Sequence, residues 1–247
     1  MHKPILRELD GSRNIVIFIH GFMGSPNQFQ DFINTVHDAE CSFYAMLLSG
    51  HGFCINEFAK YNVHDWEQQV QGELDKLKNK YDKIYLFGHS MGGLLALNAS
   101  LNKDNKIAGV FLLSTPLKMN TFNLIFFIKK LKLLLYSKSH NVKATYMKSN
   151  SIDMSNVLLY PLIIKPTINF YKLLHKTKMN LEKISVPVCM VHSTNDETTS
   201  YKSAKLLYEG LCNTKREHIT INKSWHAYFS EDEWSIVAQN LSDFIGA

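Results

Sequence analysis

The chain has 247 residues, of which 45% are hydrophobic and 20% are charged, and its formal net charge is +5. This composition is ordinary for a globular protein with a large core. No block of lysine and arginine resembles an arm that binds nucleic acid, and no apolar run is long enough to span a membrane. The N-terminal residues lack the apolar stretch of a secretory signal, and the four cysteines follow no disulfide or zinc spacing. We therefore expect a cytoplasmic protein without a metal or a cofactor.

Strands and helices are predicted in alternation along the chain. A short lead at 4–9 suits an edge strand, and the apolar run Asn14–Ile19 suits a strand buried on both faces of a parallel sheet. Ser25 and Pro26 are residue types typical of the N-cap and the first position of a helix. Further strands are expected at 41–47, 82–87, 107–113, 186–192 and 217–221, and helices at 63–80, 91–99, 200–211 and 231–245. The alternation predicts an α/β fold with a mainly parallel sheet covered by helices on both faces.

The most informative stretch is Gly88-His89-Ser90-Met91-Gly92-Gly93, at the junction of a predicted strand and helix. The glycines permit a turn so tight that larger side chains would clash, and the serine is lifted above the sheet with its hydroxyl exposed. The N–H of Met91, at the start of the helix, can donate to a developing oxyanion. Asp196 and His226 also follow predicted strands. Active groups of parallel sheets gather at the carboxyl ends of strands, so the three side chains are expected to meet there.

A serine, a histidine and an acid have separate tasks in nucleophilic catalysis. The Ser90 hydroxyl attacks only when a neutral imidazole takes its proton, and the imidazole later returns that proton to the leaving alcohol. A carboxylate fixes the imidazole tautomer and stabilises the imidazolium. Of the 11 histidines, only His226 lies between the last predicted strand and the final helix, which makes it the candidate base. Asp196 is the candidate acid, and its neighbour Glu197 is the alternative.

Together these residues resemble those of the α/β-hydrolase family, above all its small bacterial carboxylesterases and monoacylglycerol lipases. The order Ser90, Asp196, His226 along the chain is the order of that family. The resemblance implies an α/β-hydrolase core made of residues 1–116 and 181–247. It also implies a serine hydrolase that cleaves carboxylic acyl esters, monoacylglycerols or short- and medium-chain esters, through an acyl-enzyme. No nucleic acid is expected as a partner.

The resemblance also suggests how the pocket is built. The N–H of Phe22 is the expected second oxyanion donor, and Phe22, His89 and Trp225 are expected to line the substrate pocket. His20 and His51 are expected to brace the oxyanion loop by hydrogen bonding. Trp225 stands where the family often has a glycine.

Residues 117–180, between two predicted core strands, resemble the helical cap or lid of that family. They contain 11 lysines and one acidic residue, Asp153, so the segment carries +10 and the remainder of the chain −5. The stretches 122–128 and 131–136 are apolar on more than one helical face, which suggests either burial on two sides or a wall over a lipophilic pocket. Our hypothesis is a cap that forms an acyl tunnel and touches anionic lipid with its outer face. A solvated basic subdomain is the alternative.

Two other functions compete with the ester hydrolase. One is a thioesterase or lysophospholipase, which would use the same residues. The other is a non-catalytic ligand-binding member of the fold. Such members usually lack one of the three polar residues, whereas this chain has Ser90, Asp196 and His226.

Overall fold

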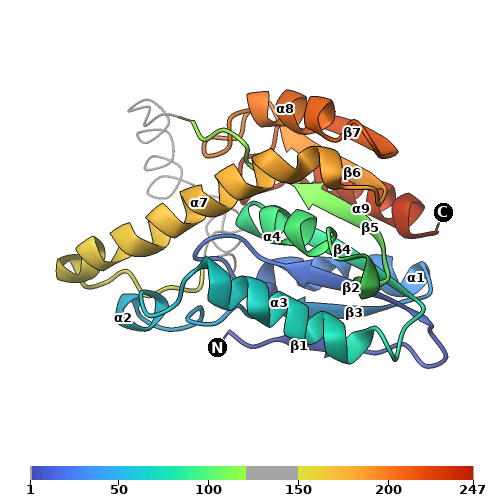
Figure 1. The fold of residues 1–247 in the computed structure, drawn as a ribbon, viewed down its shortest axis with the longest axis horizontal. Coiled ribbons are helices and arrows are strands. Elements are labelled where there is room, and N and C mark those ends of the chain that lie inside the picture. The colour runs from blue at the N-terminus through green and yellow to red at the C-terminus, as the bar shows by residue number, and fades with distance from the viewer. Residues whose placement is uncertain (1, 121–149, 247) are drawn as a thin grey trace.

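The structure of the protein is a computed structural model that describes residues 2–120 and 150–246 (Figure 1). In this part of the chain seven strands form one sheet in the order β1-β3-β2-β4-β5-β6-β7. The strands are β1 (Ile5–Arg7), β2 (Asn14–Ile19), β3 (Cys41–Met46), β4 (Lys83–His89), β5 (Ile107–Leu113), β6 (Val188–Ser193) and β7 (Arg216–Ile221). β1 pairs with β3 in antiparallel orientation, and the other neighbouring strands are parallel. The predicted mainly parallel sheet is therefore confirmed.

Helices cover both faces of this sheet. The described α-helices are α1 (Ile33–Asp38), α2 (Ile55–Phe58), α3 (Val63–Leu77), α4 (Met91–Ala99), α7 (Ile164–Asn180), α8 (Lys202–Gly210) and α9 (Glu231–Gly246). The 3-10 helices are η1 (Pro26–Phe32), η2 (Lys103–Asn105), η3 (Val157–Ile163) and η4 (Leu181–Lys183). In Figure 1, α3, α4 and α7 cover the face toward the viewer, while α1 and α9 pack on the far face.

The central strand β2 explains why the sheet is buried on both sides. Side chains alternate along a strand, so Ile15, Ile17 and Ile19 enter one core while Val16 and Phe18 enter the other. All five are at most 1% exposed. Burial of each such side chain stabilises the fold by about 1.5–3 kcal/mol. A continuous apolar run is thus what a strand between two helical layers requires.

Two helix boundaries differ from the sequence-based prediction. The helix expected after Ser25 begins as the 3-10 helix η1, with the Ser25 hydroxyl accepting from the N–H of Asn27 at 3.2 Å, and becomes α-helical only in α1. The helix expected at 63–80 ends at Leu77. There the N–H of Tyr81 donates to the Leu77 carbonyl at 3.0 Å, which turns the chain and allows the Tyr81 ring to be buried.

Part of the predicted cap, 117–180, lies within the described residues. Phe170 and Leu173 of α7 are buried in the core that includes α3 and α4, and Lys176 of α7 forms an ion pair with Glu67 of α3 at 2.7 Å. The other face of η3 and α7 is exposed to solvent. The apolar stretches at 122–128 and 131–136 lie outside the described residues, so the cap as a whole remains a prediction.

One helical stretch in the described part of the chain, Val157–Lys183, is long and apolar enough to cross a membrane, because an 18-residue window within it has a mean hydropathy of 1.2. It consists of η3, α7 and η4. Length and composition alone are weak evidence for a span. Pro161 and Pro166 lie within this stretch, and its inner face packs on the core through Phe170 and Leu173.

Candidate active site

Ser90 stands on a strained turn between β4 and α4. Its φ of 54° and ψ of −121° belong to a region that side chains other than glycine rarely adopt. The flanking glycines make the turn possible, because a Cβ on Gly92 would lie 1.9 Å from the carbonyl oxygen of Ile19. A Cβ on Gly88 would lie 2.3 Å from the Cα of Gly93. The motif therefore requires glycine on both sides of the serine.

The three polar residues singled out from the sequence form one hydrogen-bonded chain. The Ser90 hydroxyl lies 3.0 Å from Nε2 of His226, and Nδ1 of His226 lies 2.8 Å from Oδ2 of Asp196. Ser90, Asp196 and His226 follow β4, β6 and β7, whose carboxyl ends lie at the same edge of the sheet. Ser90 and Asp196 are 6% and 5% exposed. This arrangement allows the serine proton to pass to the imidazole while the carboxylate holds the ring.

The carboxyl of Asp196 is kept ionised by its partners. Burial alone would raise its pKa, but the charge and hydrogen bond of His226 and the amides of Thr199 and Thr198 outweigh burial and lower the pKa below its ordinary value. Those two amides donate to Oδ1 at 2.7 and 2.8 Å. Oδ2 is thereby left to accept from the imidazole.

Glu197, the alternative acid, has a different contact. Its Oε2 accepts from the backbone N–H of His226 at 2.9 Å. The geometry therefore favours Asp196 as the partner of the imidazole ring, and Glu197 as a support for the backbone of the same residue.

The loop that follows β2 lies beside the serine. A Cβ on Gly21 would come within 3.0 Å of the Cβ of Ser90 and 3.5 Å of its hydroxyl oxygen. Phe22 follows Gly21 directly, and the N–H of Met91 is the first in α4, where amides lack an acceptor within the helix. These are the two amides predicted to bind an oxyanion.

Two buried histidines tie this loop to the rest of the protein. His20 receives the N–H of Leu48 at 3.0 Å on Nε2 and donates from Nδ1 to the carbonyl of Gly21 at 3.0 Å. Nε2 of His51 accepts from the N–H of Met23 at 3.2 Å. Burial lowers the pKa of His20 to about 4 and the pKa of His51 well below its usual range, so both rings are neutral and able to accept. These bonds agree with the predicted bracing role.

Ser151, which sequence reasoning missed, also holds the loop. Its N–H donates to the carbonyl of Met23 at 3.0 Å, and its hydroxyl donates to the carbonyl of Gly24 at 2.5 Å. The same hydroxyl accepts from the N–H of Gly52 at 3.2 Å. A single serine far along the chain thus satisfies polar groups of two loops, and nothing in its local sequence indicated this.

The residues predicted to line the substrate pocket lie in three different surroundings. The ring of Phe22 packs on Phe58 and on Phe170 of α7, with ring centroids 5.1 and 5.8 Å apart. Trp225 is half-buried. Its backbone N–H donates to the carbonyl of Tyr228 at 2.8 Å, and this bond closes the loop that contains His226. Phe22 is thus part of an aromatic cluster shared with α7.

His89 is buried next to the loop that contains His226. Its Nε2 lies 2.8 Å from the carbonyl oxygen of His226, and the two rings are 5.0 Å apart. Burial, followed by the charge of His226, lowers the pKa of His89 to about 3, so the ring is neutral and donates from Nε2. The side chain therefore supports the backbone of the histidine loop.

Glu233 on α9 organises the start of the same loop, and the sequence analysis did not single it out. Its carboxylate accepts from the amides of Asn222, Lys223 and Ser224 at 2.6, 2.9 and 2.7 Å, and from the Ser224 hydroxyl at 2.5 Å. Burial raises its pKa, but these four bonds outweigh burial and lower it overall. One sequence feature could have indicated this role. Glu233 lies four residues before Val237, so it falls on the apolar face of the helix, where a carboxylate is unusual.

Replacing Glu233 with glutamine should lower the free energy of unfolding by about 2 kcal/mol, because an amide group cannot accept all four bonds and directs its NH₂ toward amide donors. A carboxylate with a lowered pKa stabilises the fold at pH above its usual value of 4.5, and the effect is lost as the pH falls. The loss of stability between pH 7 and 4 should therefore be smaller in Glu233→Gln. Urea unfolding at both pH values measures this, with the exposed Glu209→Gln as control. Equal stability of the two variants would contradict the prediction.

Within residues 2–120 and 150–246, no group of three or more His, Cys, Asp or Glu side chains is arranged to hold a metal ion. The polar side chains that the described site brings together are a serine, an imidazole and a carboxylate, beside two amides that are predicted to bind an oxyanion.

The family model described as "Serine aminopeptidase, S33" matches residues 10–233. The chain belongs to this family. It is 22% identical over 235 residues to the thermostable monoacylglycerol lipase of Bacillus sp. strain H-257, a match that covers 93% of this chain and 89% of the lipase. It is 23% identical to the human monoglyceride lipase, over 81% of this chain and 71% of the human protein.

A solved structure gives the same fold. The crystal structure of the monoacylglycerol lipase of Paleococcus ferrophilus matches with a TM-score of 0.74 at 17% identity, covering 99% of this chain and 98% of that protein. At this identity the match shows the fold alone. The chain is an α/β-hydrolase, as the resemblance implied.

Proposed function

We propose that the protein is a serine hydrolase that cleaves monoacylglycerols and related short- or medium-chain esters through an acyl-enzyme. At the level of the family it is a carboxylic-ester hydrolase. The observation that carries the finer proposal is the hydrogen-bonded chain from Ser90 through His226 to Asp196, with bonds of 3.0 and 2.8 Å. Two of its relatives are named as monoacylglycerol or monoglyceride lipases, which supports esters of this class as substrates.

In the proposed mechanism, the Ser90 oxygen attacks the acyl carbonyl carbon while its proton passes to Nε2 of His226. The oxyanion that forms receives hydrogen bonds from the amides of Phe22 and Met91, and Asp196 stabilises the imidazolium. The bond to the alcohol oxygen then breaks, and His226 returns the proton to the leaving alcohol. Water attacks the acyl-enzyme with the same base, which releases the acid and restores Ser90.

Rates on a graded panel of esters test the substrate class. We expect hydrolysis of monoacylglycerols and of p-nitrophenyl esters, with kcat/KM higher for octanoyl than for acetyl esters. The reason is that the ring of Phe22, which follows Gly21 in the loop beside Ser90, packs with Phe58 and Phe170 in an apolar cluster. A preference for acetyl esters would contradict the acyl tunnel. Acyl-thioester, lysophospholipid and aminoacyl-amide substrates in the same panel decide between an esterase, a thioesterase or lysophospholipase, and an aminopeptidase.

The predicted cap is also part of the proposal, with an outer face that contacts lipid. Supporting it, η3 and α7 expose Leu158, Ile164 and Ile168 at 83%, 61% and 52%. Exposed lysines also lie along α7, namely Lys165, Lys172 and Lys178. An apolar strip with lysines beside it suits the surface of an anionic membrane, where apolar burial and electrostatic attraction add.

Vesicle co-sedimentation tests this contact. Binding should be stronger to vesicles with anionic lipid than to neutral ones, and should weaken as salt increases. Ile164→Asp should weaken it further, while Ile236→Asp, an exposed isoleucine on α9 that is 43% exposed, should not. Equal binding to neutral and anionic vesicles at all salt concentrations would exclude the electrostatic part.

We also propose a cytoplasmic location. All four cysteines are free, and Cys41 and Cys189 are buried in β3 and β6, as expected of thiols in a reducing compartment. Recovery of the native protein from a periplasmic or secreted fraction would contradict this.

A further inference from the structure

The chain that follows β5 runs beside the loop that follows β6, and an antiparallel β-bridge joins them. The N–H of Asn120 donates to the carbonyl of Thr198 at 2.9 Å, and the N–H of Ser200 donates to the carbonyl of Lys118 at 2.9 Å. Two bonds in opposite directions fix the relative position of two segments, as in a β-ladder. The backbone of Asn120 is therefore held against the loop that contains Asp196.

The side chain of Asn120 makes a separate bond to the candidate acid. Its Nδ2 donates to the backbone carbonyl of Asp196 at 2.9 Å. Asn120 is half-buried and Asp196 is 5% exposed, so water is poorly placed to replace this donor. A buried carbonyl that loses its donor carries the cost of its lost solvation. The Asn120 amide therefore stabilises one position of the Asp196 backbone.

The position of that backbone determines where the carboxylate of Asp196 lies. Its Oδ1 accepts from the amides of Thr198 and Thr199, and its Oδ2 lies 2.8 Å from Nδ1 of His226. Both amides belong to the same loop, so the carboxylate and its two donors move together when the loop moves. Misplacement of a catalytic group by about 1 Å can cost up to about 10²-fold in rate.

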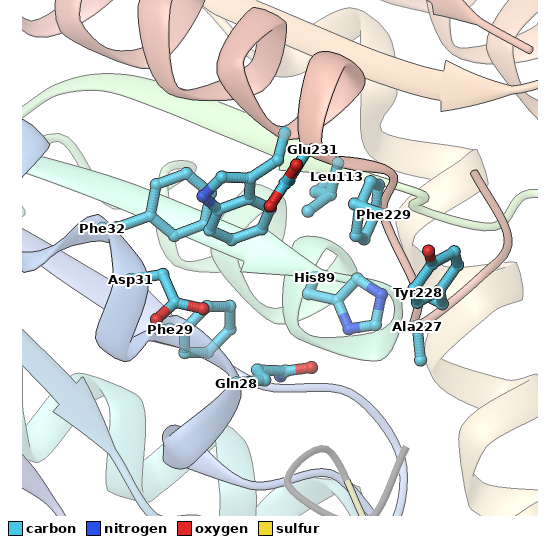
Figure 2. Close-up of a pocket in the computed structure, with 11 residues that line it drawn as sticks. Gln28, Phe29, Asp31, Phe32, His89, Leu113, Ala227, Tyr228, Phe229 and Glu231 are labelled. Atoms are coloured by element: carbon cyan, nitrogen blue, oxygen red, sulfur yellow. The ribbon is translucent and has the colours of Figure 1, made fainter. Parts of the chain in front are cut away.

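The imidazole of His226 is anchored by a different residue. Nε2 of His89 donates to the backbone carbonyl of His226 at 2.8 Å. Figure 2 shows the His89 ring directed toward Ala227 and Tyr228, which follow His226 in the chain. His89 lies on β4 and makes none of the bonds to the Asp196 loop described above, so the ring and the carboxylate are held by separate contacts. A shift of that loop would therefore change the distance between the carboxylate and the ring.

The fold does not depend on the Asn120 side chain alone, because other bonds hold the same segments. The hydroxyl of Ser203 accepts from the N–H of Lys118 at 3.0 Å, and the hydroxyl of Thr199 donates to the carbonyl of Ser114 at 3.1 Å. The backbone bridge is also independent of the side chain. Removal of the amide should therefore loosen the loop without unfolding the protein.

We propose that Asn120 is a positioning residue for the catalytic acid. Its amide holds the backbone of Asp196 so that the carboxylate meets Nδ1 of His226. This role rests on the proposed function, because Asp196 acts as the acid only in that mechanism. Asn120 donates to a backbone carbonyl, so it acts through Asp196 and not on the substrate.

Asn120→Leu removes the donor while it preserves the approximate size of the side chain and the backbone N–H. We expect kcat for an octanoyl ester to fall about fivefold, as expected for one lost hydrogen bond. KM should not change, because Asp196 stabilises an imidazolium that forms only during the reaction. The matched control is Asn213→Leu, which should leave kcat unchanged. It removes a bond of the same kind, from Nδ2 to the carbonyl of Glu182 at 2.7 Å, before β7 and away from the carboxyl ends of the strands.

The proton on Nδ1 of His226 reports on the same contact without any substrate. Its low-field NMR resonance can be assigned by its loss in His226→Gln. A longer hydrogen bond to a carboxylate is a weaker one, so the resonance should move upfield in Asn120→Leu. It should keep its position in Asn213→Leu.

Other outcomes would overturn the positioning role. With an active wild type, an unchanged kcat or an unchanged resonance in Asn120→Leu would contradict it. A rise in KM at constant kcat would assign Asn120 to substrate binding. A loss of active sites, counted with a fluorophosphonate probe, that accounts for the whole loss of rate would assign it to folding alone. If the wild type hydrolysed no ester but the resonance moved in Asn120→Leu, the proposed function would fail and the positioning of Asp196 would stand.

Discussion

Replacing Ser90 with alanine should lower kcat for ester hydrolysis by about 10⁵-fold or more, because the nucleophile is lost while the amide donors remain. The same change should abolish covalent labelling by a fluorophosphonate probe. The fold should persist, since the strained turn depends on the neighbouring glycines and not on the hydroxyl. Initial rates on an octanoyl ester and labelling with the probe measure both effects.

Ser114 offers a matched control for this experiment. It is buried directly after β5, the strand next to β4, and its φ of 51° resembles that of Ser90. Its hydroxyl has no hydrogen-bond partner within the described residues. Ser114→Ala should therefore retain activity and labelling. Labelling that persists in Ser90→Ala, in a protein that remains folded, would refute the assignment of the nucleophile.

Replacing Asp196 with asparagine should lower kcat by about 10⁴-fold, because an amide no longer stabilises the imidazolium and allows the wrong tautomer of His226. Glu197→Gln should cost less than about tenfold, since its carboxylate accepts from the backbone N–H of His226 at 2.9 Å and not from the imidazole ring. The kcat of Asp196→Asn and of Glu197→Gln is measured at pH 7.5 with the same ester. A larger loss in Glu197→Gln than in Asp196→Asn would reverse the assignment of the acid.

Much of the sheet could be predicted because burial on both faces leaves a simple trace in the sequence. The apolar runs Asn14–Ile19 and Ile107–Leu113 coincide with β2 and β5. Boundaries were less predictable where tertiary contacts decide them. The end of α3 at Leu77 depends on burial of the Tyr81 ring, and such a contact is not visible in the local pattern.

The candidate site was predictable where backbone geometry dictates the residue type. The turn at Ser90 demands glycines at fixed positions, and parallel strands bring the residues that follow them to one edge. The supporting residues were not predictable in the same way. Ser151, Glu233 and His89 act by bonds to the backbone of loops distant in sequence, and a bond to the backbone imposes no recognisable residue type on its partner.

The anchoring of Ser151 limits how the chain could be shortened. A compact variant that joins residue 117 directly to 181 would delete the serine that caps the carbonyls of Met23 and Gly24. Those carbonyls lie one and two residues after Phe22, so the excision would disturb the predicted oxyanion loop even though it removes no reacting group. A minimal enzyme should therefore retain 150–153 and be trimmed only within 121–149.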